Sequence, residues 1–176
     1  GMVQLSPDTV TGGDNGTGYN YCHNTIEGFS FNHMSGIGWY GDLGNLLVMP
    51  TTGELKTFKG TEEDPDSGYR SRYSHEREDA KIHKYTVMLD DYQIKTELAA
   101  APRSGMIRFT YPKSDVSRIQ IDLSRRIGGT STEQYVEVVD EHTIKGWMKC
   151  TPENGGWGDG DGNANYTVYF YCCFDR

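Results

Sequence analysis

The chain has 176 residues, which is enough for one domain with a hydrophobic core of its own. Its 25 acidic residues outnumber its 17 basic residues, so the formal net charge is −8 and no basic surface that would hold a phosphate backbone is indicated. No apolar run approaches the ~18 residues that a membrane-spanning helix needs. The composition therefore argues against a nucleic-acid-binding protein and against a helical membrane span.

The first 80 residues are rich in glycine, asparagine and aromatic residues, and only one clear strand is predicted there, at 46–49. A region of this kind is mostly loop, and loops laid over a rigid sheet are where function tends to lie. The acidic run 62–66 is interpreted as a solvated loop in preference to a calcium loop, because it has no repeated ligand spacing. Residues 74–81 could form two helical turns.

From residue 83 onward the apolar residues recur with a period of two, which indicates β-strands. Residues 83–89 and 92–99 predict a hairpin that turns at Asp90-Asp91. Further strands are predicted at 106–111, 116–123, 135–139, 143–149 and 166–173. Short strands without a long helix predict an all-β fold in a single domain over 1–176, either an antiparallel β-sandwich or a barrel. The alternation predicts a core made of Tyr85, Val87, Leu89, Ile94, Leu98, Ile107, Phe109, Ile119, Ile121 and Val168.

Two short motifs imitate known binding loops without the context that those loops need. Residues 36–41 match G-x-G-x-x-G, but a poor helix start follows and no strand–helix alternation does, so nucleotide binding is not indicated. Residues 159–163 resemble the beginning of an EF-hand loop, yet Ala164 stands where glycine is required and Phe170 where glutamate is required. A glycine-rich hairpin loop is the better interpretation of this segment.

Metal-binding and disulfide patterns are absent from the sequence. The four cysteines form no C-x-x-C pair, and the adjacent Cys172 and Cys173 do not make a disulfide framework. The five histidines show no metal-ligand spacing. His75, which lies near Glu78, is interpreted as part of a surface cluster.

The segment 33–45 (HMSGIGWYGDLGN) combines four glycines with residues that suit a binding site. Flat aromatic rings such as those of Trp39 and Tyr40 stack on the apolar faces of sugars, while His33 and Asp42 offer polar groups for hydroxyls. A tryptophan is also often buried in a core. The composition alone leaves both interpretations of Trp39 open.

Several segments together resemble the N-terminal domain of glycoside hydrolase family 92, the calcium-dependent exo-α-mannosidases. They follow the order of the family across nearly the whole chain: GMVQLSPDT (1–9), GYNY (18–21), IEGFSFNHMSGIGWYGDLGNLLVMPTTG (26–53), SRYSHERE (71–78), TELAAAPRSGMIRFTYP (96–112), IQIDL (119–123), IKGWMK (144–149) and YTVYFYCCF (166–174).

The resemblance implies a two-part enzyme in which a β-sandwich packs against a C-terminal barrel of paired helices. The barrel would carry the catalytic acid, the catalytic base and most calcium ligands, so neither catalytic nor metal residues are expected in this chain, which ends before any barrel and is expected to be an incomplete sandwich. The mechanism would be inverting, with two carboxyl groups ~6.5–9.5 Å apart. The family also suggests a periplasmic or secreted bacterial protein.

The sandwich of the family lends loops to the sugar pocket, and the segment 33–45 is the piece expected to do so. Its glycines let the backbone approach the sugar. The resemblance implies substrate-binding roles for His33, Trp39, Tyr40 and Asp42, whereas Phe31 and Asn32 depart from the commoner Ser-His-Thr-His run.

Two functions remain open at this point. The chain is either one lobe of an enzyme on mannose-containing glycans, inactive alone, or a free-standing carbohydrate-binding or structural module. The chain alone is expected to be inactive because its carboxylates lie in solvated runs or point outward on strands, as Glu97 and Glu137 are predicted to do. An open reading frame for a helical barrel downstream of residue 176 would decide for the enzyme.

Overall fold

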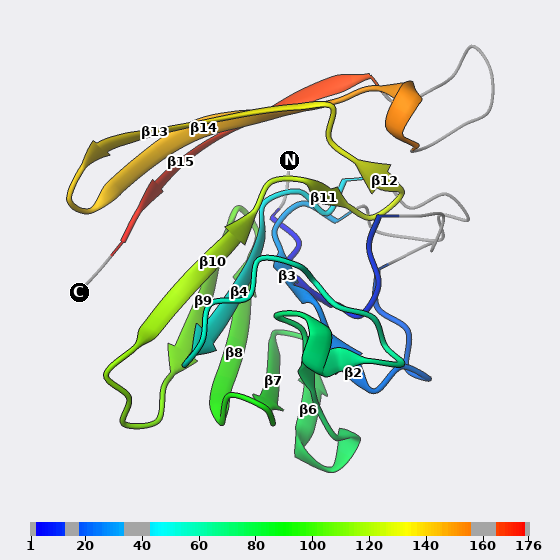
Figure 1. The fold of residues 1–176 in the computed structure, drawn as a ribbon, viewed down its shortest axis with the longest axis vertical. Helices are drawn as coiled ribbons and strands as arrows, with labels where there is room; N and C mark the ends of the chain where they lie inside the picture. Colours follow the sequence, from blue (N-terminus) through cyan, green and yellow to red (C-terminus); the bar gives the residue numbers. More distant parts are fainter. Residues whose placement is uncertain (1–2, 13–17, 34–42, 156–164, 175–176) are drawn as a thin grey trace.

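The computed structural model describes residues 3–12, 18–33, 43–155 and 165–174. Within these ranges the chain is almost entirely β-structure, arranged in antiparallel sheets (Figure 1), and no helix is long and apolar enough to cross a membrane. The strands are β1 (Ser6–Asp8), β2 (Thr25–Ile26), β3 (Gly28–Ser30), β4 (Leu47–Thr52), β5 (Ser71–Arg72), β6 (Glu78–Lys81), β7 (Lys84–Leu89), β8 (Ile94–Ala101), β9 (Ser104–Thr110), β10 (Ser117–Asp122), β11 (Arg125–Arg126), β12 (Gly129–Thr130), β13 (Glu133–Asp140), β14 (Thr143–Cys150) and β15 (Tyr166–Cys173). The 3₁₀ turns are η1 (Pro65–Ser67), η2 (His75–Arg77) and η3 (Pro152–Asn154).

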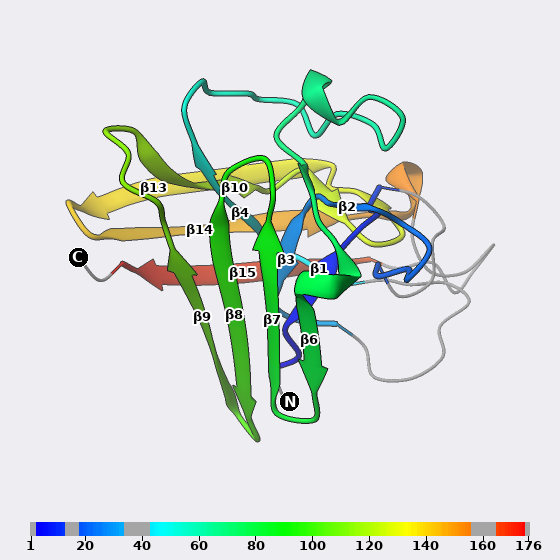
Figure 2. The same ribbon diagram turned by 90° about the horizontal axis from the view of Figure 1, so that it is seen from below.

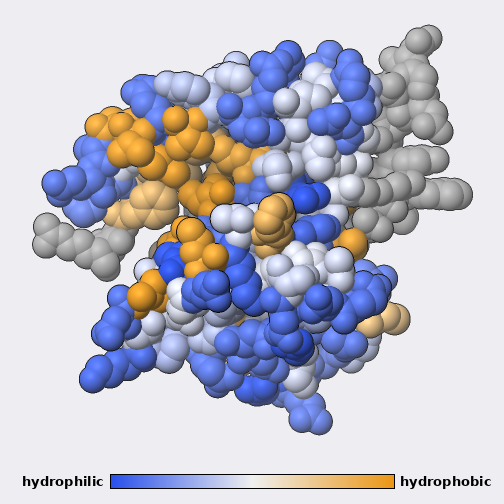
Figure 3. Space-filling model, in the orientation of Figure 1, coloured by the Kyte–Doolittle hydropathy of each residue, from blue (hydrophilic) through white to orange (hydrophobic). Residues whose placement is uncertain are grey.

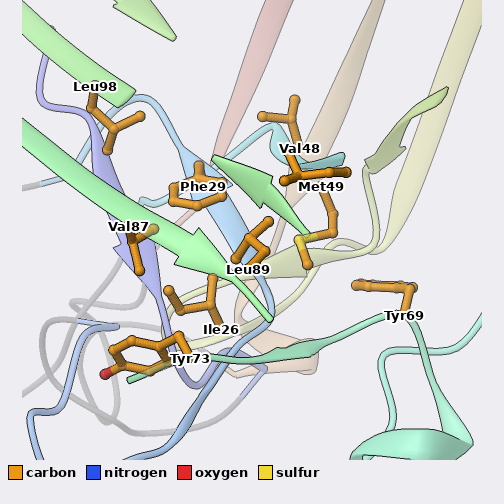
Figure 4. Packing of buried hydrophobic residues seen from close by; sticks show 10 residues of the cluster. Ile26, Phe29, Val48, Met49, Tyr69, Tyr73, Val87, Leu89 and Leu98 are labelled. Atoms are coloured by element: carbon orange, nitrogen blue, oxygen red, sulfur yellow. The ribbon is translucent and has the colours of Figure 1, made fainter. Parts of the chain in front are cut away.

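The main core lies between two four-stranded sheets, with strand orders β6-β7-β8-β9 and β1-β3-β4-β10. Seen from below, the first sheet lies in front of the second (Figure 2). Phe29 and Val48 from one sheet meet Val87, Leu89 and Leu98 from the other (Figure 4). All five side chains are buried, so the antiparallel β-sandwich that the sequence predicts is confirmed.

The predicted hairpin is confirmed as the pair β7–β8. Its register joins Leu89 to Ile94, and both side chains are fully buried beside the turn. The turn residue Gln93 has a φ of 53° and donates from its side chain to the carbonyl of Asp90 over 2.6 Å. This hydrogen bond holds a left-handed conformation that a non-glycine residue rarely adopts.

A third layer lies above the other two sheets and runs across them (Figure 1). It is the three-stranded sheet β13-β14-β15, which confirms the strands predicted at 135–139, 143–149 and 166–173. A second cluster of buried residues (Leu123, Met148 and Cys150) joins one end of this sheet to the rest of the molecule.

Some sequence predictions need correction. Ile119 was expected in the core but is 41% exposed, because β10 is the edge strand of its sheet. Residues 74–81 form the short turn η2 and the strand β6, which pairs with β7, in place of two helical turns. Glu97 lies on the outer face of β8 but is only 7% exposed, because Lys84, Lys95 and Arg108 cover it.

The remaining core predictions are confirmed to different degrees. Val87, Leu89, Ile94 and Leu98 are buried, whereas five side chains are partly buried and pack against the two clusters: Tyr85, Ile107, Phe109, Ile121 and Val168.

Candidate functional site

The described residues on either side of segment 34–42 form a closely bonded base. His33 and Leu43 face each other in an antiparallel bridge. Next to them, the Asn32 side chain donates to Asn45 Oδ1 over 2.9 Å and accepts from the Asn45 backbone N–H over 2.7 Å. Asn45 is buried. The segment between these residues therefore leaves and re-enters the sheet through one fixed point.

The chain takes an unusual backbone path as it leaves this base. Leu43 (φ 67°), Gly44 (φ 65°) and Leu46 (φ 59°) all lie in the left-handed region. For a non-glycine residue this conformation costs on the order of 1–3 kcal/mol and persists only where the surroundings enforce it. At Gly44 a Cβ atom would lie 2.5 Å from Ile127 Cγ1, so only glycine fits there.

Distant parts of the chain supply the bonds that hold this backbone. The carbonyl of Leu43 accepts from the Ile127 N–H over 3.0 Å, and the Leu43 N–H donates to the Tyr166 hydroxyl over 3.3 Å. Strained backbone fixed by such contacts is typical of ligand-binding segments.

His33 is held by a buried carboxylate and a hydroxyl. Its Nε2 lies 3.0 Å from Asp8 Oδ1 and 2.7 Å from Ser30 Oγ, which in turn donates to Asp8 Oδ2 over 2.5 Å. Burial raises the pKa of the Asp8 carboxyl, while His33 and Ser30 act in the opposite direction. His33, Asp8 and Ser30 therefore form a polar cluster at the loop base.

This cluster contains the residues of a Ser-His-Asp triad but not its geometry. In a triad the carboxylate faces Nδ1 and the serine faces Nε2, so that the imidazole can take the serine proton. Here Asp8 and Ser30 both lie at Nε2, and the Ser30 hydroxyl donates to Asp8. The arrangement orients the His33 ring and does not activate Ser30 as a nucleophile.

The segment 18–24 packs against the same cluster. At Gly18 (φ 84°) a Cβ atom would lie 2.5 Å from Asp8 Oδ1 and 3.2 Å from His33 Cε1. The next residue, Tyr19, donates its hydroxyl to Glu78 over 2.9 Å. Gly18 therefore allows a close approach of backbone to His33, and Tyr19 ties that backbone to the sheet behind it.

Glu78 collects several donors and is not part of a simple surface cluster. Besides Tyr19 it accepts from Tyr85 over 2.6 Å, and its Oε2 lies 2.5 Å from His75 Nδ1. Hydrogen bonding to Glu78 raises the pKa of His75. The ring of Tyr21 stacks on that of His75 at 3.9 Å, so the segment is fixed at both Tyr19 and Tyr21.

A buried ion cluster supports the strands beneath the site. The fully buried carboxylate of Glu27 accepts from Lys59 over 2.9 Å, from Thr11 over 2.5 Å and from the guanidinium of Arg70. The Glu27 N–H also donates to the Asp8 carbonyl over 2.7 Å. Lys59 and Arg70 neutralise the negative charge of Glu27 within the protein, which gives this cluster a structural role.

The structure describes one of the four residues of the sequence-predicted site. His33 lies at the loop base, whereas Trp39, Tyr40 and Asp42 lie outside the described residues, as does the loop 159–163. Sequence reasoning missed Asp8 and Ser30, because nothing in a linear pattern brings residue 8 next to residue 33. Asn32, which departs from the family's commoner run, closes the base by pairing with Asn45.

No group of three or more His, Cys, Asp or Glu residues that could hold a metal ion occurs in the part of the chain that the structure describes. The four cysteines are free thiols.

The described residues form an antiparallel β-sandwich in which His33 and Leu43 close the base of segment 34–42. The family model of the glycosyl hydrolase family 92 N-terminal domain matches residues 1–176. The chain belongs to this family. No match was found among curated proteins.

Solved structures extend this assignment. A family GH92 α-mannosidase from Bacteroides thetaiotaomicron, in complex with mannoimidazole, is 41% identical with a TM-score of 0.88, and the chain is covered over 100% of its length. The chain spans 22% of that protein. A GH92 family glycosyl hydrolase, ccman5, is 28% identical with a TM-score of 0.69 over 97% of this chain and 22% of its own. An inverting family GH92 mannosidase from Bacteroides thetaiotaomicron VPI-5482, 22% identical with a TM-score of 0.65, covers 97% of this chain and 20% of its own and shows the fold alone.

Proposed function

We propose that this chain is the N-terminal β-sandwich portion of a calcium-dependent α-mannosidase that hydrolyses terminal α-mannosides in glycans with inversion. Family membership and the 41% identity to an α-mannosidase support the substrate class. The chain spans about a fifth of that relative, which supports assigning the catalytic machinery to the remainder of the parent protein.

The observation that carries the role of this portion is the bonded base of segment 34–42. A loop that must contact a sugar loses affinity if it has to be ordered on binding, and a fixed base reduces that cost. The bridge between His33 and Leu43 and the pair Asn32–Asn45 fix both ends of the loop. This base supports a binding role for the segment that it joins.

Each predicted site residue has a definite part in the proposal. His33, oriented by Asp8 and Ser30, donates or accepts a hydrogen bond at a mannose hydroxyl or fixes the loop beside it. Trp39 and Tyr40 supply apolar walls for the sugar faces, and Asp42 hydrogen-bonds hydroxyls. These groups bind and orient the sugar but transfer no proton to the scissile bond.

The reaction itself is assigned to the remainder of the parent protein, in a helical barrel. Inversion requires an acid that protonates the leaving oxygen and a base that activates water, held ~6.5–9.5 Å apart. Calcium, when bound there, would hold mannose hydroxyls and favour distortion of the ring.

The first test compares two histidine variants of the parent protein. His33→Ala should lower kcat/KM on a chromogenic α-mannoside about tenfold, as for the loss of a ~1.5 kcal/mol hydrogen bond. His83→Ala changes an exposed histidine of the β6–β7 turn and serves as the matched control. Equal kcat/KM values for the two variants would contradict a role for His33 at the pocket.

The second test concerns Trp39 in the parent protein. Loss of a stacking wall in Trp39→Ala should weaken transition-state binding by about 1–3 kcal/mol while the melting temperature stays near that of the wild type. A variant that melts many degrees lower, with normal activity per folded molecule, would make Trp39 a core residue.

A further inference from the structure

The two faces of the sheet β13-β14-β15 differ in chemistry. Strand register places Val136, Gly146 and Phe170 side by side on one face, followed by Val138, Ile144 and Cys172. We call this the inner face, because its other end, at Met148 and Cys150, packs on Leu123. The opposite face carries lysine, glutamate and tyrosine side chains, for example in the pair Glu137–Lys145.

Only one end of the inner face is covered. Met148 and Cys150 are fully buried, whereas Val136 is 49% and Val138 73% exposed. At Gly146 a Cβ atom would lie 2.6 Å from the Phe170 ring, so glycine lets this ring lie across the middle strand. The cluster that begins at Met148 thus continues along the face, and no second layer formed by the described residues covers it.

The views of the whole molecule show the same asymmetry. In Figure 1 the sheet extends past β10 and β9 on the side where the β13–β14 turn lies. In Figure 3 hydrophobic surface lines a hollow on that side, both on the overhanging sheet and on the part of the molecule below it. An uncovered apolar face of this kind marks an interaction surface.

We propose that an apolar segment from the remainder of the parent polypeptide packs on this inner face and fills the hollow. The exposed end offers Val136, Val138, Ile144 and Phe170, whose side chains carry no hydrogen-bonding group. Cys172 on the same face adds only a weakly donating thiol. The face therefore suits close packing by aliphatic and aromatic protein side chains and offers little to the hydroxyls of a glycan.

The comparison with solved relatives indicates which polypeptide could cover the inner face. The solved relatives that match this chain over its full length contain several times more polypeptide, since the chain spans only 22–23% of theirs. A covalently linked segment is present at high effective concentration, which favours it over a second copy of the protein. This inference rests on family membership and does not depend on the sugar-binding role of the loop.

Thiol labelling of the parent protein tests the proposal. Val138→Cys places a thiol on the inner face, and the control Ile82→Cys places one in the β6–β7 turn, where Ile82 is fully exposed. Labelling at each site is followed by peptide mass spectrometry, which separates these thiols from the native cysteines. We expect Cys labelling at position 138 at least tenfold slower than at 82 in the native protein and equal rates in denaturant.

Two outcomes would overturn the proposal. Equal native rates at the two positions would mean that the face is open to water. Protection that disappears when the parent protein is diluted to a monomer would assign the face to a second copy of the chain. If the cysteine variant fails to fold, Val138→Ala with hydrogen exchange of β13 and β15 replaces it, and exchange as fast as in the β6–β7 turn counts against the proposal.

Discussion

The main sandwich and the overhanging sheet share the same sequence pattern but not the same burial. On β8 the inward residues Ile94, Thr96 and Leu98 are all buried, because the sheet β1-β3-β4-β10 lies over them. On β15 the inward residues alternate just as regularly, yet Val168 and Phe170 are only partly buried. The comparison teaches that a period of two identifies the face of a strand, whereas burial depends on whether a second layer covers that face.

The largest expected effect on the free energy of unfolding comes from comparing one phenylalanine in each region. Phe29→Ala should lower the free energy of unfolding by about 3–5 kcal/mol, because the ring is fully buried and its removal leaves a cavity. Phe170→Ala should cost less in chain 1–176, where the ring is partly exposed. Urea unfolding of both variants measures the difference, and equal losses would mean that the overhanging sheet is packed as firmly as the main core.

Loss of an ion pair should likewise cost more stability in the main sandwich than in the overhanging sheet. Glu27→Gln leaves the buried Arg70 without its counter-charge and should cost about 3–5 kcal/mol. Glu137→Gln removes the partner of Lys145 on the outer face of β13, where both side chains are nearly half exposed, and should cost less than about 1 kcal/mol. Denaturant midpoints provide the measurement, and a small loss at Glu27 would show that Arg70 finds another acceptor.

The strands β7, β8, β9, β10, β13, β14 and β15 could be predicted because each has at least six residues, enough to show its alternation, whereas the two-residue strands β11 and β12 were not predicted. The strands β1, β2, β3 and β5 have two or three residues, which is too short for any period, so the first 80 residues read as loop. The prediction that Ile119 is buried was wrong because alternation does not reveal that β10 is an edge strand. Within residues 74–81 the second half forms the strand β6, because it pairs with β7. Local helix propensity cannot reveal such a pairing.

The candidate site could be predicted only where its residues adjoin in sequence. His33 lies in a conspicuous glycine-rich segment, whereas Asp8 and Ser30 reach it through strands β1 and β3, which pair with each other. The role of Ile127 and Tyr166 in holding Leu43 is likewise set by tertiary contacts. Family resemblance identified the segment, and only the fold shows what holds it.

A smaller effect is expected at the junction of the two regions. Asn45 pairs with Asn32 and also donates to Cys150 Sγ over 3.5 Å, which links the loop base to the covered end of the overhanging sheet. Asn45→Ala should cost about 1–3 kcal/mol, since it leaves the Asn32 side-chain NH₂ without its acceptor, although the backbone N–H of residue 45 still donates to Asn32 Oδ1. The exposed Asn165→Ala is the control, with an expected loss of a few tenths of a kcal/mol. Similar melting temperatures for the two variants would contradict the importance of this junction.

The smallest expected effect is confined to acid pH and concerns the outer face of the main sandwich. Hydrogen bonds from Lys84 and Arg108, together with Lys95, hold the pKa of Glu97 at about 2, below its usual 4.5. Because the folded pKa is depressed, the stabilisation is complete above pH 4.5 and is lost as the pH falls toward 2. Glu97→Gln should therefore flatten the decrease of unfolding free energy over this range.

The control for Glu97 comes from the overhanging sheet. Glu133 lies 2.8 Å from Lys149 on the outer face of β13, and its side chain is more than half exposed. Water and salt screen such a pair, so Glu133→Gln should leave the acid limb of the stability curve close to that of the wild type. Urea unfolding at several pH values between 2 and 5 measures both variants. If Glu97→Gln also retains the wild-type slope, the three cations around Glu97 cover the strand without stabilising its charge, and the outer faces of the two sheets are electrostatically alike.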